Sequence, residues 1–430
     1  MTARNERSRY PDAPLHILTV HNRYKQRGGE DESREAEDRI LRERGHQIDE
    51  FVCDNSSISG AMSKWRTGLN AVWSNGVYRQ IRNYLRAHRP DLVDVHNFFP
   101  QISPAVHYAA AAEGVPTMQT FHNYRLACPA ATYYRDGEIC EECSTRFIKY
   151  PAVVHRCYRG SAFASAATAT MLALHSSLRT WQTHVDAFIA VSQFTADKMS
   201  AALSLPPDKI HVKPNFVHPA PQPGRGEGNY AIFAGRLAPE KGIRTLIAGW
   251  QLLQSDCRLR IVGDGPLERC VREAADRDRR IEYCGRFSIR ETYAAMGSAR
   301  FLICPSEWYE AFGRVVVEAF AVGTPVLTTR LGGLPELVSE GENGMLFTAG
   351  DARDLARKAA WLIENEACVR MRTGARTAFE TFYTAEANYV RMLEIYGGVL
   401  ARRRQEEQRT ARQAEITAVE PVISDYRHRA

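Results

Sequence analysis

The stretch from Cys304 to Val326, CPSEWYEAFGRVVVEAFAVGTPV, contains the end of a strand, an acidic loop, a helix, a tight turn and the next strand. The apolar run 300–304 is short and is followed by Pro305, which fits a buried strand. From Gly313 the pattern VVVEAFAV predicts a helix, and Gly323 and Pro325 end it. A strand–helix–strand unit of this kind is typical of a parallel α/β sheet.

Two glutamates flank the start of this predicted helix. Glu310 precedes it and Glu318 lies about two turns inside it, which places them roughly 12 Å apart along the axis. Such a spacing suits two contacts to one extended ligand better than a proton-sharing pair. The helix N-terminus at Ala311, Phe312 and Gly313 offers N–H groups to a phosphate. The alternative is an ordinary strand–helix unit with Glu318 on a solvated face.

The full pattern, E-x-F-G-x-x-x-x-E-A-x-A-x-G-x-P-V, resembles the retaining glycosyltransferases of family 4, which have the GT-B fold and use nucleotide-sugar donors. A second motif, G-R-L-x-x-E-K-G, follows a strand that ends at Ala234, and it is also characteristic of this family. The resemblance implies that Arg236 and Lys241 contact the donor diphosphate. Fixed cations there would stabilise the charge left on the nucleotide when the glycosyl–phosphate bond breaks.

The resemblance also assigns donor contacts around the first motif. It implies that Glu318 binds the ribose hydroxyls and Glu310 the sugar hydroxyls, with backbone N–H groups at Phe312 and Gly313 assisting. The pair Gly332–Gly333, in RLGGLPELV, is expected to border the nucleotide.

Two further positions lie in the first half of the chain. Gly28 and Gly29 fall between the first strand and the first helix and form a candidate cradle for phosphate or sugar, although a glycine pair alone often marks only a turn. His122, in TFHNYR, matches the family histidine that faces the donor sugar. The residues expected to act in catalysis are Arg236, Lys241, His122 and Glu310.

Four of the ten cysteines form the pattern Cys128-x11-Cys140-x2-Cys143-x13-Cys157. A C-x-x-C with two further cysteines can hold a structural zinc ion in a tetrahedral site. The outer spacings match no common zinc-ribbon template, and independent buried thiols are the alternative. Similar segments occur in a bacterial subset of the resembled family, in the acceptor-side domain.

Length and net charge limit the number of domains and the kinds of partner that the chain can have. A chain of 430 residues should hold two domains, and a net charge of +6 is compatible with anionic ligands or membrane headgroups without specifying nucleic acid. The N-terminus has no apolar signal-like region, and the run 161–178 is the nearest to a membrane span. We therefore expect a cytoplasmic protein, with peripheral contact at the inner face of the cytoplasmic membrane through basic helices near 79–89.

The resulting expectation is an α/β protein of the GT-B fold, with two Rossmann-like domains facing across a cleft and a C-terminal helix crossing back to the first domain. The expected segments are a disordered lead-in (1–12), an acceptor-side domain (13–217), a linker (218–228), a nucleotide-sugar-binding domain (229–384), the crossover helix (385–404) and a disordered tail (405–430).

The resemblance implies a hexosyltransferase-type retaining glycosyltransferase that uses a UDP- or GDP-sugar and a lipid-linked or polysaccharide acceptor in bacterial surface glycan synthesis. No cofactor is expected for catalysis, because the Asp276-Arg277-Asp278 triplet lies at the wrong end of the sheet to hold a donor metal. No nucleic-acid partner is expected. Two alternatives stay open: a nucleotide-sugar epimerase of the same fold and a non-catalytic scaffold.

Overall fold

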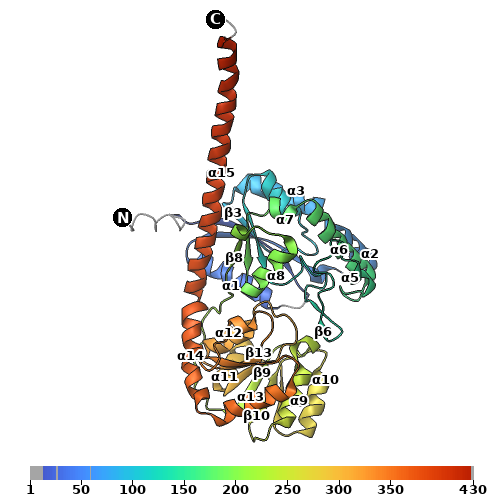
Figure 1. Ribbon diagram of the computed structural model, residues 1–430, viewed down its shortest axis with the longest axis vertical. Coiled ribbons are helices and arrows are strands. Elements are labelled where there is room, and N and C mark those ends of the chain that lie inside the picture. The colour runs from blue at the N-terminus through green and yellow to red at the C-terminus, as the bar shows by residue number, and fades with distance from the viewer. Residues whose placement is uncertain (1–12, 26–27, 59, 428–430) are drawn as a thin grey trace, which may run out of the picture.

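The computed structural model describes residues 13–25, 28–58 and 60–427, arranged as two α/β domains stacked end to end (Figure 1). The predicted lead-in, 1–12, and the last three residues of the predicted tail lie outside the described residues. One long helix, α15, runs along one side of the N-terminal domain and extends beyond it (Figure 1).

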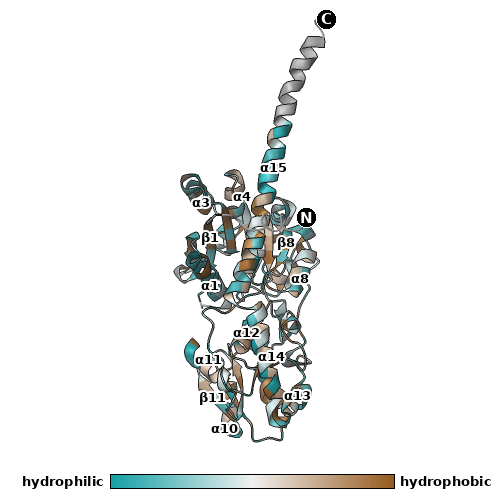
Figure 2. Ribbon diagram, turned by 90° about the vertical axis from the view of Figure 1, so that its left-hand side faces the viewer, coloured by the Kyte–Doolittle hydropathy of each residue, from teal (hydrophilic) through white to brown (hydrophobic). Residues whose placement is uncertain are grey.

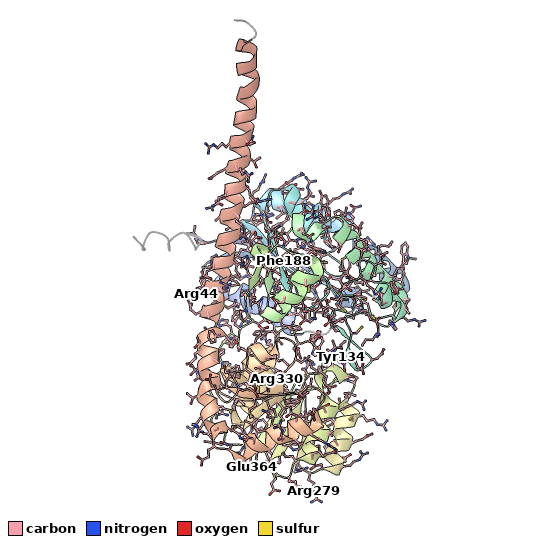
Figure 3. All side chains as sticks on the ribbon, in the orientation of Figure 1. Arg44, Tyr134, Phe188, Arg279, Arg330 and Glu364 are labelled. Carbon is pink, nitrogen blue, oxygen red and sulfur yellow. The ribbon has the colours of Figure 1, made fainter. Side chains whose placement is uncertain are left out.

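The N-terminal domain is built on a parallel sheet in the order β2-β1-β3-β4-β7-β8. Its central strands are buried along their whole length because helices cover both faces. Phe188, at the centre of this domain, is fully buried (Figure 3). The strands are β1 (His16–Arg23), β2 (Gln47–Asp54), β3 (Leu92–Asn97), β4 (Thr117–Phe121), β7 (Ala187–Ala190) and β8 (Ile210–Val212).

The C-terminal domain has a second parallel sheet in the order β11-β10-β9-β12-β13-β14. Numbered within the domain this is the order 3-2-1-4-5-6 of a Rossmann fold. The strands are β9 (Tyr230–Ala234), β10 (Arg258–Val262), β11 (Ile281–Gly285), β12 (Phe301–Cys304), β13 (Val326–Thr329) and β14 (Gly344–Phe347). A separate hairpin, β5 (Tyr134–Arg135) with β6 (Glu138–Ile139), belongs to the first domain and extends towards the second (Figure 1).

Helices connect the strands and carry the apolar residues that close the cores (Figure 2). In the first domain they are α1 (Gly29–Glu43), α2 (Gly60–Val72), α3 (Asn75–His88), α4 (Ala105–Ala112), α5 (Tyr150–Val154), α6 (Ala162–Ser177), α7 (Thr180–Thr183) and α8 (Gln193–Leu203). In the second they are α9 (Ile243–Leu252), α10 (Glu268–Arg277), α11 (Ile289–Ser298), α12 (Arg314–Ala321), α13 (Ala352–Glu364) and α14 (Ala367–Phe382).

The last helix, α15 (Ala385–Arg427), confirms the predicted return to the first domain. Its residues Met392, Ile395 and Val399 belong to the buried cluster that contains Ile17 of β1. The Tyr396 hydroxyl donates a hydrogen bond of 2.7 Å to Asp94, within β3 of the same sheet. The helix therefore completes the core of a domain whose last strand, β8, ends 173 residues before α15 begins.

The prediction of a disordered tail after residue 404 was wrong for the described part, because α15 continues to Arg427. Figure 2 shows that the helix becomes hydrophilic where it leaves the domain. The segment is rich in Arg, Glu, Gln and Ala, which are strong helix formers, and Arg403 pairs with Glu406 one turn later at 3.5 Å. In this segment the intrinsic helix propensity of the residues therefore outweighs their high polarity. The segment 54–76, expected as a loop, likewise contains α2.

The chain passes between the domains at two neighbouring points. The Val217 N–H donates to the Tyr383 carbonyl at 3.2 Å, and the Asn388 side chain donates to the Pro214 carbonyl at 2.7 Å. Most of the predicted linker 218–228 is held by the second domain, since Gly224 N–H bonds to the Val322 carbonyl at 2.9 Å. The two crossings therefore form one compact hinge.

Candidate active site

The predicted site residues lie where the carboxyl ends of both sheets face each other. In open α/β sheets, ligands bind beyond these ends, at the point where the strand order reverses. That point lies between β9 and β12 in the second domain, and the loops after these two strands carry Arg236 and Glu310. In the first domain it lies between β1 and β3, and the loop after β1 carries Gly28 and Gly29.

Lys241 and Glu310 form the central ion pair of this region. Lys241 Nζ lies 2.5 Å from Glu310 Oε1, which also accepts a hydrogen bond of 2.7 Å from the Ser306 hydroxyl. Burial alone would raise the pKa of Glu310, but the Lys241 charge and these hydrogen bonds outweigh it and hold the pKa below its usual value. Burial would lower the pKa of Lys241, and Glu310 reverses that direction too. Both groups are therefore charged at neutral pH.

Arg236 is the more accessible cation. Its side chain is 57% exposed and pairs with Glu240, which lies four residues later on the same loop. An exposed pair of this kind contributes little to stability. The guanidinium can therefore exchange Glu240 for an anionic ligand at small cost.

Glu318 is held by a residue that the sequence did not single out. Arg314, the first residue of α12, lies 2.9 Å from Glu318 and 3.3 Å from Glu32 on α1 of the other domain. Burial raises the pKa of Glu318 and the Arg314 charge opposes that rise. Arg314 thus connects the motif at 304–326 to the first domain, a contact between distant segments that no local pattern could reveal.

The glycines at the motif are explained by packing of the protein. Gly313 has φ +90°, and a Cβ there would lie 2.4 Å from Leu334 Cδ2. A Cβ on Gly332, with φ +65°, would lie 2.7 Å from both the nitrogen and the oxygen of the Glu310 backbone. The expectation that Gly313 is needed for close approach of a ligand is therefore replaced by an internal reason. Gly333 also packs here, its N–H donating to the Glu310 carbonyl at 2.8 Å, so donor contacts at Phe312, Gly313, Gly332 and Gly333 stay predictions.

Gly28 and Gly29 show the opposite behaviour. No described residue lies within 4 Å of a Cβ placed on Gly28, and a Cβ on Gly29 would meet only Arg314 Cδ, at 3.6 Å. Neither glycine has a positive φ, so the backbone does not require it. The N-terminus of α1 therefore opens into space beside α12, which agrees with the predicted cradle.

His122 lies at the end of β4, next to a second buried histidine. His96 Nδ1 and His122 Nε2 are 3.0 Å apart, and the two rings stack. Burial and the neighbouring His21 lower the pKa of His122 to about 3, and burial lowers the pKa of His96 as well. His122 is therefore neutral at pH 7 and is available as a hydrogen-bonding group without a charge.

Glu30 is a candidate that the sequence analysis missed. It follows the glycine pair in the first turn of α1, and its Oε2 accepts a hydrogen bond of 3.0 Å from Asn123, the neighbour of His122. Its Oε1 is buried and has no hydrogen-bond partner among the described residues. Burial, with Asp31 adding to it, raises the pKa of Glu30 to about 8. The signal available in the sequence was an acid directly after a glycine pair.

The buried polar cluster behind His96 has the geometry of a metal site but already holds a cation. Oxygen or nitrogen atoms of Glu37, Asp94 and His96 lie within 4.8 Å of one another. Lys213 Nζ lies 2.5 Å from Glu37 Oε1 and is almost fully buried. This ammonium group supplies the positive charge that the carboxylates need.

The four cysteines Cys128, Cys140, Cys143 and Cys157 are all unpaired thiols around the β5–β6 hairpin. Among the described residues they form no group of three ligand atoms within 4.8 Å, so the sulfurs are further apart than a closed Zn–S4 site requires. Lys149 nevertheless lies beside them, 7% exposed and without an ion-paired carboxylate among the described residues. Zinc therefore stays a prediction that requires the sulfurs to move together.

Metal analysis tests this prediction directly. Protein purified without chelators should contain close to one zinc per chain, and Cys140→Ser with Cys143→Ser should remove it. Wild-type protein that contains no zinc and has four titratable thiols in this segment would refute the predicted zinc site.

Two family models match this chain, one over each domain. The model for Glycosyltransferase Family 4 matches residues 39–220, and the model for Glycosyl transferases group 1 matches 228–365. The chain belongs to the family 4 glycosyltransferases. The resemblance stated from the motifs is thereby confirmed, and the two matches cover both sides of the candidate site.

Curated relatives match over part of the chain. An uncharacterized glycosyltransferase from Methanocaldococcus jannaschii is 33% identical over 186 residues, covering 43% of this chain and 51% of its own length. A phosphatidyl-myo-inositol mannosyltransferase from Mycobacterium leprae is 32% identical over 208 residues, covering 46% of this chain and 55% of its own. The chain thus spans about half the length of these relatives.

Solved structures extend the likeness to the whole fold. The Anabaena protein HepE, crystallised with UDP, superposes with a TM-score of 0.61 at 16% identity, over 87% of this chain and 98% of its own. Together with the two parallel-sheet domains and the crossing helix, this confirms the predicted GT-B fold.

Within the described residues, no helix combines the length and apolarity that crossing a membrane requires.

Proposed function

We propose that the protein transfers a sugar from a nucleotide-sugar donor to an acceptor with retention of anomeric configuration. The observation that carries the proposal is the buried Lys241–Glu310 pair at the point where the strand order of the second sheet reverses, with the exposed Arg236 beside it. Fixed cations there suit a leaving diphosphate, and they need no metal ion.

In this proposal other residues of the site bind the sugar, the ribose and the phosphates of the donor. Glu310 and Glu318 accept hydrogen bonds from sugar and ribose hydroxyls, and the N-termini of α12 and α1 face the phosphates. Neutral His122 contacts the sugar. Glu30, protonated at neutral pH, can lie near the diphosphate without repelling it.

The donor in this proposal is a UDP- or GDP-sugar. Support for UDP comes from HepE, whose solved structure contains UDP. The acceptor is a lipid-linked or polysaccharide glycan of the bacterial surface, acted on at the inner face of the cytoplasmic membrane. Support for a lipid comes from the Mycobacterium leprae relative, whose name specifies phosphatidyl-myo-inositol. Neither finding favours the epimerase or the scaffold.

Calorimetric titration of the purified protein with UDP, GDP, ADP and TDP tests the donor site, without added metal. One nucleotide should bind more tightly than the others, and Lys241→Ala should weaken it. Failure of a folded protein to bind any of the four would contradict the transferase proposal and favour a scaffold.

A further inference from the structure

Large apolar side chains are exposed on three helices at one end of the N-terminal domain. On α2 they are Met62, Trp65 and Leu69, of which Met62 is 77% exposed. Before and on α5 they include Ile148 and Val154, which are 63% and 68% exposed. Exposed patches of this kind mark sites of interaction with a partner or a membrane.

These residues form one surface. Helices α2 and α5 both pack against α6, and α6 adds the exposed Phe163. Figure 1 shows the three helices together at the edge of the domain opposite α15. We call this surface, made by α2, α5, α6 and the segment 143–149, the apolar face.

The two sequence segments that form the apolar face contain no acidic residues. Segments 55–90 and 143–185 have no Asp or Glu and eleven Lys or Arg. The whole chain has a net charge of +6, so the rest of it carries −5. Arg82 and Arg86 pair with Glu113, and Arg146 lies beside Glu142, but Arg66 and Arg156 form no ion pair with another described residue. The positive charge is thus concentrated where the apolar side chains are exposed.

This combination matches an anionic bilayer surface. Trp, Phe and Leu side chains enter the boundary between headgroups and acyl chains, and Lys and Arg around them attract anionic lipids. A face that binds another protein need not be uniformly positive, because the surface of a protein partner carries charges of both signs. The excess of positive charge beside exposed apolar side chains therefore favours an anionic lipid surface over a protein.

A groove leads from this face towards the candidate active site. Residues of α2 and α6, with Gly68 and Ala167 among them, line an apolar cavity of about 250 Å³. Phe99 lines this cavity and also a smaller one that contains His122. Arg125 lies between the two, its guanidinium 4.8 Å from the Phe99 ring centre. A lipid chain in the groove would place a phosphate near Arg125 and a sugar near His122.

We propose that the apolar face docks on an anionic membrane and that the groove between α2 and α6 holds one lipid chain of the acceptor. The docking stands on the face itself, whereas the role of the groove rests on the proposed glycosyl transfer. The two parts are tested separately.

Vesicle sedimentation with the full chain tests the docking. Wild-type protein should bind phosphatidylcholine vesicles that contain phosphatidylglycerol far better than phosphatidylcholine alone, and salt should release it. Trp65→Ser with Ile148→Ser should lower the partition coefficient at least about tenfold, because each side chain loses its burial in lipid. The matched control is Val369→Ser, an exposed apolar residue on α14 (67% exposed), which should bind like wild type.

Two results would overturn the docking. One is equal binding by the wild type and the double variant. The other is a wild-type dimer in solution that the double variant converts to a monomer without any vesicle binding by either, which would make the apolar face an interface between copies. Nucleotide titration of the same samples keeps the donor site separate, since neither substitution lies near it.

Filling the groove tests the lipid chain. A Cβ on Gly68 would lie 2.7 Å from Phe163 Cε1, so Gly68→Leu must displace that ring and occupy the cavity. Dansyl-undecanoic acid should fluoresce more strongly with wild-type protein, and Gly68→Leu should abolish the increase while nucleotide binding persists. An unchanged fluorescence increase in a folded Gly68→Leu variant would refute the proposal that the groove holds a lipid chain. Absence of nucleotide binding by the wild type would instead refute the proposed transferase function.

Discussion

At the residue scale, two carboxyl groups of the same site have opposite protonation at neutral pH. Glu310 is ionised because Lys241 lies against it, whereas Glu30 is protonated because it is buried beside Asp31 with no cation in contact among the described residues. The first can accept two hydrogen bonds from a sugar, and the second can donate one.

Removing Lys241 should affect activity more than any other single change at the donor site. Lys241→Ala is expected to lower kcat/KM by about 10²–10³, the range for loss of one preorganised electrostatic contact. It also leaves Glu310 buried without a cation and so lowers stability. The control is Lys241→Met with Glu310→Gln, which removes both charges and should recover the melting temperature but not the activity. Wild-type kinetics in a folded Lys241→Ala protein would refute its role.

Glu30 gives a testable pH dependence of stability. Its pKa is about 8 in the folded protein against 4.5 ordinarily, so between these values the folded state holds a proton that the unfolded state has released. The stability from this group is therefore lost as the pH rises through that window. Glu30→Gln should gain melting temperature relative to wild type between about pH 5 and about pH 9. A constant difference across the range would show that the Glu30 pKa is ordinary.

The sequence identified Lys241, Glu310 and Glu318 because each belongs to a local pattern with a chemical reason. It could not identify Arg314, Glu30 or Asn123 as site residues. Their roles depend on which segments meet across the cleft, as in the 3.3 Å contact of Arg314 with Glu32, and a local pattern carries no information on that pairing.

At the scale of single elements, α15 divides into a buried half and an exposed half. Met392, Ile395 and Val399 repeat at helical spacing and join the first core, as expected for the crossing helix that the family resemblance implied. From Arg404 to Glu415 no such repeat exists, and the polarity of this stretch is as compatible with an exposed helix as with disorder.

Substitutions on α15 should separate these halves. Ile395→Ala, at 3% exposure, should lower the free energy of unfolding by about 2–5 kcal/mol, the usual cost of truncating a core residue. Truncation after Arg404 should change it little, because the removed side chains that are described are exposed. Chemical denaturation measures both, and a large loss on truncation would show that the exposed half packs on something.

At the scale of the whole molecule, hydrogen bonds between side chains and backbone join the two domains across the cleft. Glu336 of the second domain accepts from the N–H groups of Gln193 and Phe194, at 2.7 Å and 2.6 Å, at the N-terminus of α8. Tyr309 donates to Glu141 beside the hairpin at 2.7 Å. In Figure 3 Tyr134 of this hairpin lies at the boundary between the domains.

Breaking the Glu336 contact should open the molecule about its hinge. A carboxylate at a helix N-terminus contributes about 0.3–1 kcal/mol, and more when partly buried, so its loss shifts a two-state equilibrium measurably. Glu336→Ala should increase the radius of gyration in small-angle X-ray scattering, and saturating nucleotide should reverse the increase. Arg353→Ala, an exposed change on α13, serves as the control. Identical scattering from both variants would mean that the other cross-domain contacts suffice.

The return of α15 to the first core also sets the order in which the protein can be completed during its synthesis. Val399 is made 182 residues after Val217, and ribosomes add about 5–20 residues per second, so the first domain waits on the order of 10–40 s for its last helix. In that interval Ile17, Leu92 and Ile189, which α15 later covers, are uncovered on the nascent chain. The domain that is translated first is thus the one that most needs a chaperone.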